Sequence, residues 1–153
     1  MMVGEIGNEE LILRLCLAAA FGAALGFDRE MRGYAAGIRT HSIVALSAAV
    51  TSISALILYN SLLAEGSHAD PLRVIQGLAQ AIGFICAGLI FVRRGDVRNI
   101  TTAANLWMAA ALGISVGLGH YALVIIAAII ALLLLTVVRK LEHRFLRNEE
   151  DKN

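Results

Sequence analysis

Long stretches of the chain carry no charged side chain, and this leaves few folds open to it. The clearest stretch, Ala122–Val138, reads ALVIIAAIIALLLLTVV. It lacks the period-two alternation of a barrel strand and therefore predicts a helix. A helix that is apolar on every side is either buried in a large protein or spans a membrane. Because the chain has only 153 residues, of which 58% are hydrophobic, we expect an integral membrane bundle.

The number of such stretches predicts the fold class. A spanning helix needs about 20 apolar residues, within a range of roughly 17–25. Five segments meet or approach this length: Leu11–Phe27, His41–Leu63, Leu72–Val92, Ala103–Leu118 and Tyr121–Val138. In lipid the backbone groups must be satisfied within each segment, so all five are expected to be helices. The prediction is an all-α fold, a five-helix transmembrane domain over residues 1–138 with a short charged tail at 139–153.

The connections agree with five spans. Asp70-Pro71 pairs a good N-cap residue with proline at the first helical position, which predicts the start of the third span. Asn99 or Thr101 is expected to cap the fourth. Gly117–His120 reads GLGH, a turn so short that the fourth and fifth spans must form an antiparallel hairpin.

The basic residues predict the orientation. With five spans, the first-to-second loop, the third-to-fourth loop and the tail lie on one side of the membrane. These regions hold eleven of the thirteen Lys and Arg residues, leaving only Arg14 and Arg73 for the other side. By the positive-inside rule, the N-terminus is predicted outside and the C-terminus in the cytoplasm. The lipid bilayer is the expected surrounding partner.

Small residues recur at spacings that favour close helix packing. The candidate packing glycines occur in the first, third and fourth spans: Gly22, Gly26, Gly83, Gly88, Gly113 and Gly117. Small residues let two helix backbones approach each other within a membrane. Packing within the chain is the favoured interpretation, and a homo-oligomer, such as a dimer, is the alternative.

Several functional classes are disfavoured. Motifs of hydrolases, kinases and dinucleotide-binding proteins are missing, so an enzyme is not expected. The arginines alternate with spans and not with exposed aromatic residues, which argues against nucleic acid as a partner. Cys16 and Cys86 lie in apolar runs without a CxxC motif and are expected to act as small hydrophobic residues. No cofactor is predicted, although Mg²⁺ could be a substrate or ligand.

Polar residues within the spans are candidate functional residues because they are costly there. Arg14 either extends to the outer head groups or faces inward and pairs with a partner. Gln76 and Gln80 share one helix face, and either bond to neighbouring helices or line a polar vestibule. For Asn105 the same two roles are considered: a hydrogen bond to a neighbouring helix, or a place in a polar vestibule.

A second set of candidates forms a charged group on the predicted inner face. It consists of Asp28, Arg29, Glu30, Arg39, Thr40, His41, Asp96, Arg98, Thr101 and Thr102. Mg²⁺ prefers oxygen ligands, so Asp28, Glu30 and Asp96 are weak candidates for a metal site. Arginines outnumber these carboxylates locally. The favoured hypothesis is therefore a network in which Asp28 and Glu30 pair with Arg29, Arg39, Arg93 or Arg98.

Three sequence blocks resemble the MgtC/SapB family of bacterial inner-membrane proteins. They are LRLCLAAAFGAALGFDREMRGYAAGIRTH, GFICAGLIF and VRNITTAANLWMAAALGISVGLG, in matching order and spacing. Most of the candidates above, including Arg14, Asp28, Arg39 and Arg98, stand at motif positions, and so does Trp107. Cys86 replaces a usual glycine, and Asn99-Ile100 replaces a usual Gly-Leu.

The resemblance implies five spans with the C-terminus inside and a link to growth at low Mg²⁺. It leaves two functions open: Mg²⁺ transport or homeostasis, and a non-transporting module that binds and regulates other inner-membrane proteins. Virulence members of the family carry a soluble C-terminal domain. Here only RKLEHRFLRNEEDKN follows the fifth span, so the chain is expected to be a short member without that domain.

Overall fold

The structure, a computed structural model, describes residues 6–66, 70–93 and 96–138. Its helices are α1 (Asn8–Glu30), α2 (Ile38–Ala64), α3 (Leu72–Leu89), α4 (Ile100–Gly117) and α5 (Tyr121–Leu133), and α5 continues directly into the π-helical turn η1 (Leu134–Val138). Within these residues, five helices are long and apolar enough to cross a membrane when η1 is counted with α5. The predicted multi-pass helical fold is confirmed to this extent.

One part of the fold departs from the all-α prediction. Strands β1 (Phe91–Arg93) and β2 (Asp96–Arg98) pair as an antiparallel hairpin between α3 and α4. The third helix therefore ends at Leu89, and the prediction that it runs to Val92 was wrong. Phe91, Val92 and Val97 have aromatic or β-branched side chains, which favour strands, and strand pairing satisfies backbone groups once the helix has ended.

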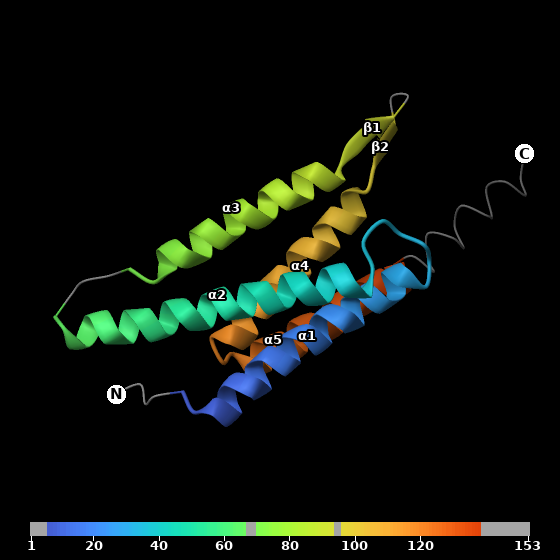
Figure 1. Ribbon diagram of the computed structural model, residues 1–153. Coiled ribbons are helices and arrows are strands. Elements are labelled where there is room, and N and C mark those ends of the chain that lie inside the picture. Colours follow the sequence, from blue (N-terminus) through green and yellow to red (C-terminus); the bar gives the residue numbers. More distant parts are fainter. Residues whose placement is uncertain (1–5, 67–69, 94–95, 139–153) are drawn as a thin grey trace, which may run out of the picture.

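Helices α1, α2 and α4 form the core (Figure 1). Each of the three packs along the other two, and α5 lies against α1 and α4. Helix α3 contacts mainly α4 and has little burial, which leaves most of its surface exposed. In Figure 1 the N-terminal end of α1, the α2–α3 connection and the α4–α5 turn lie at the left. The α1–α2 connection, the β-hairpin and η1 lie at the right.

Glycines permit the close approach of the core helices. A Cβ atom at Gly22 would lie 2.5 Å from the His41 carbonyl oxygen, and one at Gly26 would lie 2.7 Å from that of Gly37. On α4, Gly113 and Gly117 meet the α2 backbone at Ala45 and Ala49 in the same way. On α3, by contrast, Gly83 meets only the Trp107 ring, and Gly88 has open space beside it. Backbone contact therefore joins α2 to α1 and α4, but not to α3.

The ends of α3 and α4 are held by side chains. The Asp70 carboxylate accepts a hydrogen bond from the Leu72 amide at 3.0 Å, although Pro71, and not Asp70 as predicted, occupies the N-cap position of α3. Asn99 occupies the N-cap position of α4, but its side chain does not cap that helix. Instead, its amide donates to the Leu89 carbonyl at 3.1 Å, and its backbone is left-handed with φ of 67°. Asn99 thus ties the start of α4 to the end of α3.

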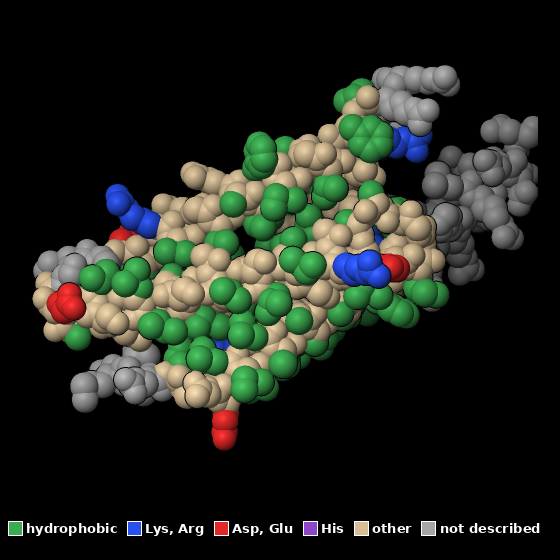
Figure 2. Space-filling view, in the orientation of Figure 1, with side chains coloured by type: hydrophobic (Ala, Val, Ile, Leu, Met, Phe, Trp, Pro, Cys, Tyr) green, Lys and Arg blue, Asp and Glu red, His purple; other side chains and the backbone are tan. Residues whose placement is uncertain are grey.

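Hydrophobic and charged side chains are distributed over the surface as expected for a membrane-spanning bundle. On the face in Figure 2, hydrophobic side chains cover the length of the helices, and charged side chains gather toward the two ends. Large exposed hydrophobic residues include Phe84 at 83% and Ile126 at 58%. In water such surface would be costly, whereas lipid chains accommodate it.

Candidate functional site

Four buried polar residues meet inside the core, toward the end that carries the α1–α2 connection. They are Arg29 on α1, His41 on α2, and Thr102 and Asn105 on α4, and each is at most 4% exposed. We refer to these four residues as the polar cluster. Ser52 is the other buried polar residue in the described ranges, and its hydroxyl simply donates to the Ala48 carbonyl of its own helix. The polar cluster therefore holds nearly all the buried side-chain polarity that the structure describes.

Hydrogen bonds assign the state of His41. Its Nδ1 lies 2.8 Å from the Gly37 carbonyl oxygen, which can only accept, so Nδ1 carries the proton. Its Nε2 lies 3.1 Å from Nδ2 of Asn105, an amide donor, so Nε2 accepts. The Asn105 amide also donates to the Leu25 carbonyl at 3.3 Å. His41 is therefore a neutral imidazole that joins α2 to α4, and Asn105 extends the link to α1.

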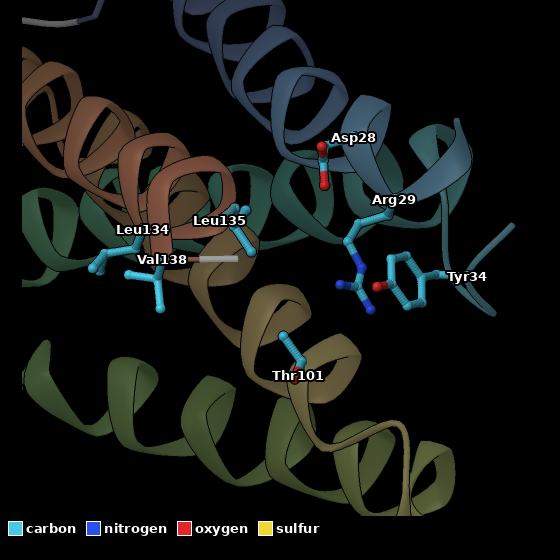
Figure 3. A pocket seen from close by; sticks show the side chains of 7 residues that line it. All are labelled: Asp28, Arg29, Tyr34, Thr101, Leu134, Leu135 and Val138. Carbon is cyan, nitrogen blue, oxygen red and sulfur yellow. The ribbon is translucent and has the colours of Figure 1, made fainter. Parts of the chain in front are cut away.

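Arg29 is the charged member of the polar cluster. Its Nη2 donates to the Thr102 hydroxyl of α4. The guanidinium also lies against the Tyr34 ring, 3.4 Å from the ring centroid (Figure 3). Such stacking suits arginine, which is planar and weakly hydrated. Its Nε is buried without a hydrogen-bond partner in the structure as described.

The acidic candidates lie beside the polar cluster and not within it. Asp28 Oδ1 pairs with Arg32 Nη2 at 2.7 Å. Glu30 Oε2 accepts a hydrogen bond from the Ile38 amide at 2.7 Å, which closes the α1–α2 connection. The partner of Asp28 seen here, Arg32, was not among the arginines named from the sequence. Its position four residues after Asp28, just beyond the end of α1, is the signal that could have found it.

The remaining inner-face candidates are dispersed. Arg39, Thr40, Arg98 and Thr101 are exposed. The backbone of Asp96 lies in β2, but its side chain falls outside the described part of the chain, as does that of Arg93. Within the described ranges, no three His, Cys, Asp or Glu residues come together as metal ligands. The Mg²⁺ site predicted at Asp28, Glu30 and Asp96 includes a side chain outside the described part of the chain and stays a prediction.

A second polar contact lies at the opposite end of the bundle. Arg14 faces inward, where its Nε pairs with Glu10 at 2.8 Å and its Nη1 donates to the Gly117 carbonyl at 2.7 Å. The Tyr121 hydroxyl donates to the same Glu10 carboxylate. Arg14 therefore fastens α1 to the α4–α5 turn. Glu10 was not named from the sequence, although it stands four residues before Arg14, and no sequence signal pointed to Tyr121.

The two glutamines are in a different environment. Gln76 and Gln80 are both exposed on α3, and neither makes a hydrogen bond to another described residue. They do not bridge α3 to its neighbours within the described chain. They are instead available on the helix that is least packed against the others.

The polar cluster has a limited chemical repertoire. It contains one cation, one neutral imidazole, a hydroxyl and an amide, and it includes no carboxylate or thiol. Its charge therefore favours anions over metal cations. Three of its hydrogen bonds join core helices: His41–Asn105 joins α2 to α4, and Asn105–Leu25 and Arg29–Thr102 join α4 to α1.

Together, the fold and the polar cluster define a multi-pass α-helical membrane protein with a buried cation near one end of its core. Residues 15–144 match the MgtC family. The chain therefore belongs to the MgtC family, as the motif resemblance predicted.

Known relatives are similar over most of the chain. One from Escherichia coli K12, named "Putative magnesium transporter YhiD", is 37% identical over 140 residues, covering 91% of this chain and 65% of the relative. Protein MgtC of Brucella abortus is 39% identical over 138 residues, covering 86% of this chain and 55% of the relative. Protein SrpB of Synechococcus elongatus is 36% identical over 145 residues and is covered to 76%. The chain thus spans less than two thirds of YhiD and of MgtC, and no solved structure matches it significantly.

Proposed function

We propose that this chain acts in bacterial Mg²⁺ homeostasis, in adaptation to low Mg²⁺, as a multi-pass protein of the inner membrane. The name of the YhiD relative and membership of the MgtC family support the link to magnesium. The proposed orientation places the N-terminus outside. It follows from the positive-inside rule, because Arg32, Arg39 and Arg98 belong to the end of the bundle where α1 ends and α2 and α4 begin.

Two mechanisms would fit this role: transport of Mg²⁺ and regulation of another membrane complex. The observation that favours regulation is the Arg29 guanidinium, only 3% exposed, between α1 and α4. A Mg²⁺ ion needs oxygen ligands and keeps several waters, and a fixed positive charge would repel it. Backbone contact at Gly22 and Gly113 also leaves little room between α2 and its two core neighbours. We therefore propose that the chain is a regulatory module and keep Mg²⁺ transport, which the relative's name favours, as the second candidate.

A regulatory module needs a surface for its partner, and α3 is the most available one. Phe84 is 83% exposed, and Gln76 and Gln80 present amide groups on the same weakly packed helix. Amides that face lipid are costly unless a neighbouring helix satisfies them. Another inner-membrane protein, or a second copy of this chain in a homo-oligomer, would supply that helix.

Two measurements on the same protein separate these ideas. The first is growth at limiting Mg²⁺ of a bacterial host that lacks its own relative, with and without this chain, after its membrane level has been checked by immunoblot. The second is Mg²⁺ entry into proteoliposomes that hold the purified chain and a Mg²⁺-sensitive dye, at both voltage polarities. Empty vesicles show the Mg²⁺ entry that does not depend on the protein. The Arg29→Gln variant shows whether entry depends on the fixed positive charge.

We expect the chain to restore growth without increasing Mg²⁺ entry above that of empty vesicles. Restored growth together with protein-dependent entry would replace regulation with transport. A chain that reaches the membrane and leaves growth unchanged would overturn the proposed link to Mg²⁺. The Gln76→Ala,Gln80→Ala variant adds a further check, because regulation through α3 predicts that it folds normally and loses most of the rescue.

A further inference from the structure

A cavity of about 190 Å³ opens beside the polar cluster, at the end of the bundle where α1 ends (Figure 3). Its polar wall is formed by Asp28, Arg29, Tyr34 and Thr101. A water molecule takes up about 30 Å³ in the liquid, so the space would hold about six waters or one group of comparable size. Arg29 is 3% exposed, whereas Tyr34 and Thr101 are exposed. The cavity therefore leads from the surface to a buried guanidinium.

The opposite wall is aliphatic. It is formed by Leu134, Leu135 and Val138, all from the π-helical turn η1. Leu134 is 58% and Val138 is 42% exposed, so this wall continues onto the outer surface of the fifth span. π-Helical turns are uncommon and often occur at functional sites. The cavity thus combines a cationic wall with an apolar wall that faces lipid.

The charge of Arg29 is incompletely satisfied within the described residues. The two ion pairs found there are Arg14–Glu10 and Arg32–Asp28, and neither includes Arg29. Its partners are the Thr102 hydroxyl and the Tyr34 ring, and the nearby Asp28 carboxylate attracts it, while its Nε has no hydrogen-bond partner. A buried charge is costly unless it is paired. An anion in the cavity would provide that pairing.

The charges around the cavity also favour an anion. Asp28 lines the same wall, but its carboxylate is paired with Arg32 at 2.7 Å. The three charged groups Asp28, Arg29 and Arg32 therefore leave one net positive charge. Guanidinium groups bind phosphate oxygens through two parallel N–H donors, which makes arginine well suited to phosphate. The Thr101 hydroxyl on the same wall offers a further donor.

We infer that this cavity binds the phosphate group of an anionic phospholipid, with the head group toward Arg29 and the acyl chains along Leu134 and Val138. Its position at the end of membrane-spanning helices places it at head-group depth. Free phosphate shares the same chemistry, but it would leave the aliphatic wall without a partner. A bound lipid at this site would hold the ends of α1, α4 and α5 together.

The test uses two neighbouring leucines of similar exposure. Leu134 lines the cavity, whereas Leu133, 54% exposed, does not. The full chain, purified in detergent, is titrated with dioleoyl phosphatidylglycerol, with dioleoylglycerol (which lacks phosphate) or with inorganic phosphate. Bound species are counted by native mass spectrometry. The wild-type chain is compared with Leu134→Trp, which fills the cavity, with Leu133→Trp, and with Arg29→Gln.

We expect phosphatidylglycerol to bind at least tenfold more tightly than dioleoylglycerol. Leu134→Trp and Arg29→Gln should weaken this binding at least tenfold, and Leu133→Trp less than twofold. If Arg29→Gln does not fold, the two leucine variants still decide the matter. Equal effects of Leu133→Trp and Leu134→Trp, or no preference for the phospholipid, would mean that only water or non-specific lipid occupies the cavity. Displacement of phosphatidylglycerol by inorganic phosphate at equal concentration would overturn the lipid as the source of the anion.

Discussion

Replacement of Gly22 by alanine tests whether backbone contact between α1 and α2 organises the core. The added Cβ would lie 2.5 Å from the His41 carbonyl oxygen, 2.7 Å from the Ser42 Cα and 2.8 Å from the His41 carbonyl carbon. These neighbours are backbone atoms, so no side-chain rotation relieves the overlap. The two most extensively packed helices must then move apart.

The cost follows from this geometry. Overpacking of a well-packed core typically destabilises by about 1–3 kcal/mol. At roughly 2–4 °C per kcal/mol for a chain of this size, the melting temperature should fall by about 2–12 °C. The matched control is Gly77→Ala on α3, also inside a helix, where a Cβ meets nothing within 4 Å. That variant should be unchanged or more stable, by up to about 1 kcal/mol, because alanine restricts the unfolded chain.

The two cysteines provide the assay. Cys16 is exposed and Cys86 is buried, where its thiol donates to the Ala103 carbonyl at 3.2 Å. In a Cys16→Ser background, a thiol-reactive fluorophore therefore reports the unfolding that exposes Cys86 as the purified protein is heated in detergent. If the Gly22→Ala and Gly77→Ala proteins have the same melting temperature, the α1–α2 contact does not depend on the absence of a side chain at Gly22.

Two further variants address the polar contacts. Asn105→Leu removes the donor to His41 Nε2 and to the Leu25 carbonyl, so it should destabilise the protein by about 1–3 kcal/mol in the same assay. Wild-type stability of this variant would show that these hydrogen bonds contribute nothing. Asp28→Asn should lower stability more than Asp70→Asn, with a difference of about 1 kcal/mol or less, because it breaks an ion pair at 2.7 Å. The amide oxygen introduced by Asp70→Asn can still accept from the Leu72 amide. Equal melting temperatures of the two variants would show that the Asp28–Arg32 pair is fully screened.

The spans could be predicted from the sequence more completely than the site. Spans were predicted from hydropathy, because the requirement for backbone satisfaction in lipid acts on each helix separately. The hairpin after Leu89 was missed, since Phe91 and Val92 are as apolar as the residues of the helix before them. Hydropathy distinguishes apolar from polar segments, but it does not distinguish a helix from a strand in so short a run.

The site was predicted less completely, for a different reason. All four residues of the polar cluster were named as candidates, but the contacts among them were not predicted. The contact between Arg29 and Thr102 joins α1 to α4, and the stacking of Tyr34 on Arg29 depends on the path of the α1–α2 connection. Such contacts depend on how each helix is rotated about its axis, which residue spacing does not reveal. Contacts four residues apart on one helix, such as Glu10–Arg14, depend only on helix geometry and could have been found.

Two adjacent threonines allow the role of the buried cation to be separated from that of its surroundings. Thr102 is 1% exposed and accepts the Arg29 hydrogen bond, whereas Thr101, its neighbour on the same helix, is exposed. Thr102→Val keeps the shape of the side chain but leaves Nη2 of Arg29 without its acceptor. Hydrogen bonds to charged groups contribute about 1.5–3 kcal/mol, so Thr102→Val should destabilise by that amount, and Thr101→Val should stay within about 0.5 kcal/mol of wild type.

A double-mutant cycle then shows whether the loss of stability in Thr102→Val comes from its hydrogen bond with Arg29. In an Arg29→Met background the charged donor is gone, so Thr102→Val should cost at least about 1 kcal/mol less than it does in the wild-type chain. The same cost in both backgrounds would mean that Thr102 stabilises α4 by itself and that Arg29 is held by the Tyr34 ring alone. If the coupling is present, Arg29 connects α1 to α4 through one hydroxyl. An anion that binds Arg29 would then act on the contact between these two core helices and so on how the bundle packs.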